Sequence, residues 1–176
     1  MNKVFTTRRL CRAGIIAALY TALTYVFAPF AYGPLQIRPA EALCILPLFY
    51  AEAVPALFVG CLLSNLLSVY SIFDIAFGSL ATLLAAVGSY LVGVYIKKEG
   101  LKIFLGGLFP VLVNAIVIPV VIVFLCGDLG AQKTATAAYF TYVGSIFLSQ
   151  TLWVYGGGVP FYFAIKRLQS RLPFFR

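Results

Sequence analysis

The chain has 176 residues, of which 62% are apolar and only 10% charged, and it carries a formal net charge of +8. Ordinary soluble domains are roughly 45–50% apolar and about 25% charged, so this composition, with a mean hydropathy of +1.01, excludes a typical soluble fold. A chain this apolar must take lipid as its solvent, and lipid-spanning segments of this length are expected to be helices.

Prolines, glycines and charge clusters divide the chain into apolar segments, each expected to be a membrane helix of one all-α domain over residues 1–176. The first segment is too long for the apolar region of a signal peptide and is taken as a span. The second is short, because twelve residues cover only roughly 18 Å of a core about 30 Å thick. The second and third segments could therefore form one interrupted helix. The six predicted helices are residues 10–31, 40–51, 53–70, 75–96, 103–126 and 136–165.

The distribution of charge favours six spans over five. With six spans, both termini are cytoplasmic and only Arg38 and Lys133 of the 13 basic residues fall outside, as the positive-inside rule requires. The net charge is then an orientation signal and a contact with anionic lipid, and no nucleic-acid partner is needed. The basic residues expected inside are Lys3, Arg8, Arg9, Arg12, Lys97, Lys98, Lys102, Lys166, Arg167, Arg171 and Arg176.

Little in the sequence points to a cofactor or to catalysis. The four cysteines occur singly and the chain has no histidine, so no metal site is expected and the cysteines are interpreted as small apolar residues within helices. No phosphate-binding loop is present, so the chain cannot use ATP by itself and active transport would need a partner protein.

Polar residues at membrane depth are the candidate functional residues, because each costs free energy unless it has a partner or a role. Arg38 and Glu41 could bind a solute, or could be an ion pair that caps the second helix at a partly hydrated position. Asp74 could bind solute or cap the fourth helix. Asn114 lies mid-span, where no cap is needed and a ligand or another helix must bind the amide. The remaining candidates are Gln36, Asn65 and Gln150.

The last helix and the first each carry a further pattern. Gln150 and Trp153 are spaced i, i+3 and are expected to share a face, where an indole beside an amide suits a flat heterocycle, although a packed core tryptophan is the alternative. Beyond them, glycines and a proline at 156–160 permit a kink. On the first helix, Gly14, Ala18 and Ala22 form a stripe that could dock a partner or pack internally.

Several runs together resemble the QueT family of queuosine-precursor transporters. The runs are GPLQIRPAEAL (33–43), GCLLSNLL (60–67), DIAFGSLATL (74–83) and PVLVN (110–114). The resemblance implies a substrate-binding (S) component of an energy-coupling factor (ECF) transporter in the cell membrane, which captures a 7-deazaguanine such as preQ1, preQ0 or a queuine-like base. It also implies docking through Gly14, Ala18 and Ala22 onto a transmembrane coupling protein with two ATPases. One departure is Gln150, where the family pattern often has glutamate.

Other functions remain open at this stage. An S component for a different vitamin-like solute would share all the features above. A stand-alone exchanger would use a carboxylate at mid-span, and none is expected there. A lipid-modifying membrane enzyme would need an acid–base or metal cluster, which five acids without histidine do not favour.

Overall fold

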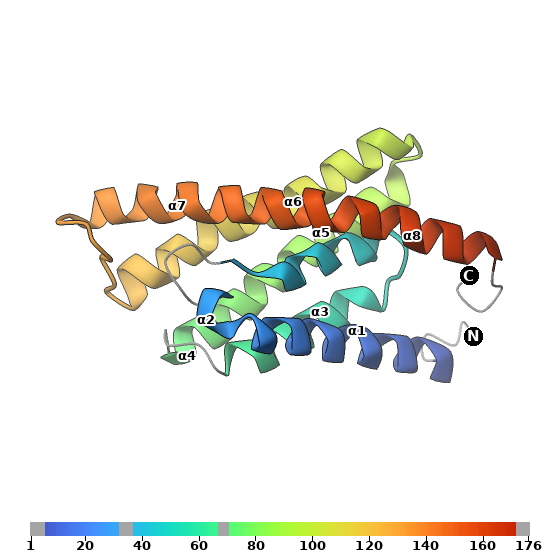
Figure 1. The fold of residues 1–176 in the computed structure, drawn as a ribbon, viewed down its shortest axis with the longest axis horizontal. Helices are drawn as coiled ribbons and strands as arrows, with labels where there is room; N and C mark the ends of the chain where they lie inside the picture. The colour runs from blue at the N-terminus through green and yellow to red at the C-terminus, as the bar shows by residue number, and fades with distance from the viewer. Residues whose placement is uncertain (1–5, 32–36, 67–70, 172–176) are drawn as a thin grey trace.

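The computed structural model describes residues 6–31, 37–66 and 71–171, and every regular element in this part of the chain is a helix (Figure 1). The elements join into rods, several of them with short 3₁₀ or π segments. In chain order they are α1 (Thr7–Val26) with α2 (Ala28–Ala31), the 3₁₀ helix η1 (Pro39–Leu48), α3 (Ala53–Asn65), α4 (Ser71–Phe73) with the π segment η2 (Asp74–Gly78) and α5 (Ser79–Tyr95), α6 (Glu99–Val120) with the π segment η3 (Val121–Leu125), and α7 (Ala135–Thr151) with the π segment η4 (Leu152–Gly157) and α8 (Gly158–Arg171).

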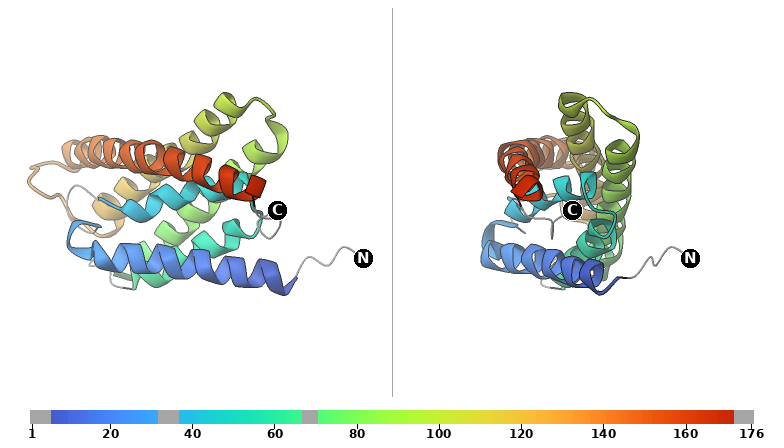
Figure 2. Two further views of the ribbon diagram at one scale, coloured as in Figure 1. Left: turned by 45° about the vertical axis from the view of Figure 1, so that its right-hand side comes forward. Right: turned by 90° about the vertical axis from the view of Figure 1, so that its right-hand side faces the viewer.

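The short second helix is the centre of the bundle. All residues of η1 except Ala42 are buried, and η1 contacts α1, α3, α5, α6 and α8, which surround it (Figure 2). As a 3₁₀ helix it rises about 2.0 Å per residue, so its 10 residues span roughly 20 Å. The sequence predicted a helix over 40–51, and the observed helix is shorter and more tightly wound. It begins at Pro39, and Pro47 lies next to its last residue.

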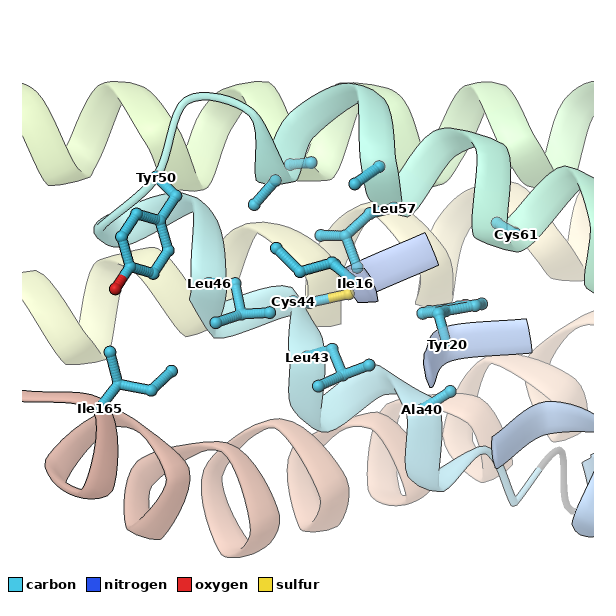
Figure 3. Packing of buried hydrophobic residues seen from close by; sticks show 13 residues of the cluster. Ile16, Tyr20, Ala40, Leu43, Cys44, Leu46, Tyr50, Leu57, Cys61 and Ile165 are labelled. Carbon is cyan, nitrogen blue, oxygen red and sulfur yellow. The ribbon is translucent and has the colours of Figure 1, made fainter. Parts of the chain in front are cut away.

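The second and third segments are separate helices, not one interrupted helix. The chain reverses direction in the turn at 49–52, so η1 and α3 are antiparallel (Figure 1). Between them lies a cluster of buried apolar side chains that includes Ile16 of α1, Leu43 of η1 and Leu57 of α3 (Figure 3). This cluster fixes η1 against α1 and thereby places the first turn of η1 beside the middle of α1.

Two glycines permit close helix approaches. A Cβ on Gly60 of α3 would lie 2.9 Å from the Cβ of Tyr20, and one on Gly93 of α5 would lie 2.9 Å from the Leu48 backbone. Thr21 of α1 strengthens the first crossing, because its Oγ1 donates to the Gly60 carbonyl at 3.2 Å. Close backbone approach through small residues is the usual basis of helix packing in membranes.

The prolines and glycines of the long rods change the winding of the helix and do not end it. The rod that begins with α6 continues past Pro110 and Pro119 into the π segment η3. The last rod was expected to be interrupted at the glycines of 156–158, and there the chain forms the π segment η4 between α7 and α8. A π turn holds more residues than an α turn and so changes the direction of the side chains beyond it.

Most basic residues lie on elements that meet at one end of the bundle, which we call the basic end. The start of α1, the turn at 49–52, the start of α6 and the end of α8 all lie there (Figures 1 and 2). Arg12 pairs with Glu52 at 3.2 Å, Gln169 donates to the Tyr50 hydroxyl at 2.9 Å, and Lys166 of α8 pairs with Glu99 of α6.

Two helices in the described part of the chain are long and apolar enough to cross a membrane by length and composition: Asp74–Tyr95, with 22 residues, and Glu99–Leu125, with 27. Helices η1 and α3 are apolar but have only 10 and 13 residues. Six spans with both termini inside therefore stay a prediction, with which the gathering of charge at the basic end agrees.

Candidate solute-binding site

A buried carboxylate from η1 forms the centre of the candidate site. The 3₁₀ helix carries Glu41 into the bundle, where the residue is only 1% exposed. Three donors from different positions reach it: Tyr20 Oη at 2.7 Å from Oε1, and Cys44 Sγ at 3.1 Å and Asn114 Nδ2 at 3.4 Å from Oε2. The prediction that Glu41 lies at a partly hydrated helix end is wrong, because the helices around η1 cover its first turn.

A second charged group lies beside the first. Arg38, just before η1, is buried, and its guanidinium lies 3.9 Å from Asp74 Oδ2 while its Nε donates to the Ala31 carbonyl at 3.2 Å. Asp74 is fully buried and does not cap a helix, since the rod has already begun at Ser71 and the π segment η2 starts at Asp74. Asn65 Nδ2 donates to the Asp74 backbone carbonyl at 3.1 Å, which links the end of α3 to the same group.

Arg38, Glu41 and Asn114 line one small cavity together with residues of other helices. Its volume is about 10 Å³, roughly the space of one water molecule. It is lined by five polar residues and two isoleucines, namely Arg38, Glu41, Thr82, Asn114, Gln150, Ile118 and Ile146. Of the residues predicted from sequence, four therefore line a common cavity although they come from three different rods and one connection.

Two amides at the cavity have an unused acceptor. Asn114 Oδ1 and Gln150 Oε1 are buried, and neither has a hydrogen-bond partner within the described structure. A buried polar atom without a partner costs about 1–3 kcal/mol, so such an atom calls for an explanation. Together with the Glu41 carboxylate they make the cavity wall rich in acceptors, and Arg38 supplies donors on the same wall.

Trp153 does not line this cavity, although it was predicted to share a face with Gln150. The π segment η4 begins at Leu152, and its additional residues per turn widen the angle between positions 150 and 153. The indole is half-buried, and its Nε1 is a further buried donor without a partner in the described structure. The predicted residue Gln36 lies outside the described residues.

Two hydroxyl-bearing residues of the site, Tyr20 and Thr82, were not predicted from sequence. Tyr20 is 1% exposed and its hydroxyl makes the shortest contact to Glu41. A signal existed, since a hydroxyl in the middle of an apolar membrane helix must find a partner. The chain has 11 tyrosines, however, and only the fold distinguishes this one from the others.

Two cysteines are more than the small apolar residues that the sequence suggested. Cys44 Sγ donates to Glu41, and Cys61 Sγ accepts hydrogen bonds from Thr82 Oγ1 at 3.2 Å and Asn65 Nδ2 at 3.5 Å. Both thiols are buried and free. Cys44 thus belongs to the Glu41 group and Cys61 to the Asn65–Asp74 group, and Thr82, which donates to Cys61, lines the same cavity as Glu41.

The small-residue stripe on α1 faces outward. Gly14, Ala18 and Ala22 are all exposed, and a Cβ on Gly14 would meet no atom of the described chain within 4 Å. The alternative that this stripe packs inside the protein is therefore not supported. The face of α1 that packs inward carries Ile16, Tyr20 and Thr24 instead.

Comparison with known proteins supports the resemblance noted from the sequence. The family model described as QueT transporter matches residues 10–167. The chain belongs to the QueT transporter family. It is also 38% identical over 71 residues to the queuosine precursor transporter QueT of Lactococcus lactis subsp. cremoris (strain MG1363), a stretch that covers 39% of this chain and 41% of that protein. No solved structure matches the chain.

The family is described as one of transporters, which are membrane proteins and not enzymes. The matched residues 10–167 contain α1, η1 and every residue that lines the cavity. The cluster around Glu41 is thus part of the region that defines membership.

Proposed function

We propose that this QueT-family chain is the S component of an ECF-type importer in the cell membrane, with six spans and both termini in the cytoplasm. In this function it captures a queuosine precursor, a 7-deazaguanine base, from outside. The observation that carries the proposal is the buried cavity lined by Arg38, Glu41, Asn114 and Gln150 in a chain of this family.

The chemistry of the cavity wall suits a guanine-like edge. Such an edge presents several N–H donors next to one carbonyl acceptor. Glu41 and the unused amide oxygens of Asn114 and Gln150 accept from N–H groups, and the Arg38 guanidinium donates to a carbonyl. A base bound in this way would give the two amide oxygens the partners that they lack.

The surroundings of Glu41 favour a solute that carries a positive charge. Its three partners are a hydroxyl, a thiol and an amide, and no ion pair in the described structure includes it. The nearby Arg38 pairs with Asp74 instead, and a buried carboxylate without a salt bridge is costly, so a cation that reaches Glu41 is favoured. Among the queuosine precursors this points to preQ1, which has an aminomethyl cation, over the neutral nitrile preQ0.

Binding requires the cavity to enlarge. Its volume of about 10 Å³ is far below the roughly 300–1,000 Å³ typical of ligand sites. Ile118 of α6 and Ile146 of α7 make no hydrogen bonds with their side chains, so the cavity can widen between these two helices without breaking one at these positions. If the cavity widens toward η4, Trp153 becomes a stacking surface for the base.

Transport requires partners, which we propose are a transmembrane coupling protein and two ATPases. The exposed stripe of Gly14, Ala18 and Ala22 is the proposed docking surface, because its small side chains let another helix approach closely. The chain itself needs no cofactor in this scheme.

The first prediction concerns solute selectivity. Calorimetric titration of the detergent-purified chain should show preQ1 binding more tightly than preQ0, and both more tightly than guanine, with queuine as a fourth ligand. Tight binding of guanine alone, or no binding of any of the four by folded protein, would contradict the proposed substrate class and favour another vitamin-like solute.

The second prediction concerns the amides. Asn114→Ala and Gln150→Ala should each weaken preQ1 binding by roughly tenfold, because each removes a hydrogen bond worth about 1–1.5 kcal/mol. Trp153→Ala should also weaken binding if the base stacks there. Gln169→Ala is the matched control, since its amide bonds Tyr50 at the basic end and should leave affinity unchanged. Unchanged affinity in both Asn114→Ala and Gln150→Ala would place the solute elsewhere.

A second candidate function is a stand-alone carrier coupled to protons. The buried carboxylates of Glu41 and Asp74, at 1% and 0% exposure, are the observation that favours it. Uptake that persists in cells without an ECF module and collapses with the proton gradient would establish this alternative.

A further inference from the structure

A groove opens between α1 and α3 toward the basic end. The two helices meet at Tyr20 and Gly60 and leave a groove of about 530 Å³ between that crossing and the start of α1. Its walls are almost entirely apolar, with Leu10, Ala13 and Ala17 on α1 and Pro55 and Val59 on α3. Gly14 also lines it, and this glycine leaves the groove open because no side chain fills the space.

The mouth of this groove is positively charged. Arg9 lines it and is exposed. Glu52 lines it too, but its carboxylate is held by Arg12 at 3.2 Å. The other ion pairs of the described chain, Arg38–Asp74 and Lys166–Glu99, do not include Arg9 either, so its charge has no acidic counterpart there.

We propose that the α1–α3 groove binds one anionic phospholipid of the inner leaflet, with its head group on Arg9 and an acyl chain along the apolar walls. An apolar groove fits an acyl chain, and a cationic mouth fits a phosphate-bearing head group with net negative charge. A soluble phosphate would leave the apolar walls unused, and a zwitterionic lipid would leave Arg9 without net compensation. The inference rests on the proposed orientation, in which the basic end faces the cytoplasm.

The lipid and the proposed docking partner share one residue. Gly14 belongs both to the groove and to the stripe that Ala18 and Ala22 continue. A helix docked on the stripe near Gly14 would therefore displace the acyl chain, so the lipid occupies the groove in the isolated subunit.

Native mass spectrometry of the purified full-length chain tests this proposal. The protein is titrated with phosphatidylglycerol and, separately, with phosphatidylcholine of the same acyl chains, and sn-glycerol 3-phosphate serves as the soluble head-group probe. We expect one phosphatidylglycerol to be retained in preference to phosphatidylcholine, and no retention of glycerol phosphate. Arg9→Gln should lower phosphatidylglycerol retention by roughly fivefold, the equivalent of about 1 kcal/mol for one arginine at an anionic surface.

Two further variants separate this site from general lipid binding. Gly14→Phe fills the groove and should abolish the preference, while Lys97→Gln removes an exposed charge at the same end, outside the groove, and should preserve it. Equal retention of the two lipids, or equal losses in Arg9→Gln and Lys97→Gln, would overturn the proposal. Phosphatidylglycerol retention that is unchanged in both Arg9→Gln and Gly14→Phe would overturn the proposal as well, and would favour a protein partner for the groove. Retention of glycerol phosphate as strong as that of the lipid would show an anion site without an acyl-chain site.

Solute titration of the same variants keeps the two proposals apart. Arg9→Gln and Gly14→Phe lie outside the cavity and should keep the preQ1 affinity of the unaltered chain, which also shows that they are folded. Loss of lipid preference with intact solute binding would test the lipid site in the groove alone. Absence of solute binding in every variant and in the unaltered chain would contradict the proposed function alone.

Discussion

Glu41→Gln is expected to weaken preQ1 binding by about 100-fold while weakening preQ0 binding by roughly tenfold or less. Removing one partner of a buried charge pair costs about 2–5 kcal/mol, whereas loss of a neutral hydrogen bond costs about 1 kcal/mol. The substitution preserves shape, and because Tyr20 and Asn114 donate to different carboxylate oxygens, one of the two retains an oxygen to which it can donate. Calorimetric titration with both ligands measures the difference directly.

The control for this prediction is Glu99→Gln, which neutralises a carboxylate that pairs with Lys166 at the basic end, away from the cavity. It should leave both affinities unchanged. Equal losses of preQ1 and preQ0 affinity in Glu41→Gln would show that Glu41 supplies hydrogen bonding but no charge recognition. Unchanged affinity for both would remove Glu41 from the site.

Ala18→Leu is expected to reduce uptake by cells at least tenfold without changing solute affinity. Ala18 is exposed on the outer face of α1, so a larger side chain disturbs no packing within the chain but prevents the close approach of a partner helix. Uptake of labelled preQ1 by cells that express the whole transporter measures the first effect, and titration of the purified chain measures the second.

Ala137→Leu is the matched control, because Ala137 is exposed at the start of α7 and the substitution is the same. It should support normal uptake. Normal uptake with Ala18→Leu would place the docking surface elsewhere on the chain. Loss of solute binding together with uptake would instead mean that Ala18 contributes to folding.

The sequence was a good guide to the helices but not to their winding. The lengths of the apolar segments, and the prolines, glycines and charges between them, located the helices, because each membrane helix needs a similar length of apolar residues. Length could not reveal that the second segment is a 3₁₀ helix, since that depends on the neighbours that bury η1 on every side. The same holds for η4, whose π winding begins between Gln150 and Trp153 and could not be foreseen from the length of the segment.

For the candidate site, single residues were predictable and their partners were not. Asn114 was recognisable as an amide at mid-span with no capping role, and it lines the cavity. The pairing of Arg38 with Asp74 and of Tyr20 with Glu41 joins residues that are 36 and 21 positions apart in the chain, and no local pattern encodes either contact. Partners at such separations arise from helix packing, which periodicity does not describe.

The central position of η1 also bears on how the protein is made. The ten residues of η1, one of them Glu41, are too few to enter a bilayer as an independent span, and a lone 3₁₀ helix of this length is not a stable unit. During biogenesis this segment therefore reaches its place only as the later helices close around it. The cavity beside Glu41 is then complete only once α7 has been made, because α7 supplies Ile146 and Gln150 of its wall.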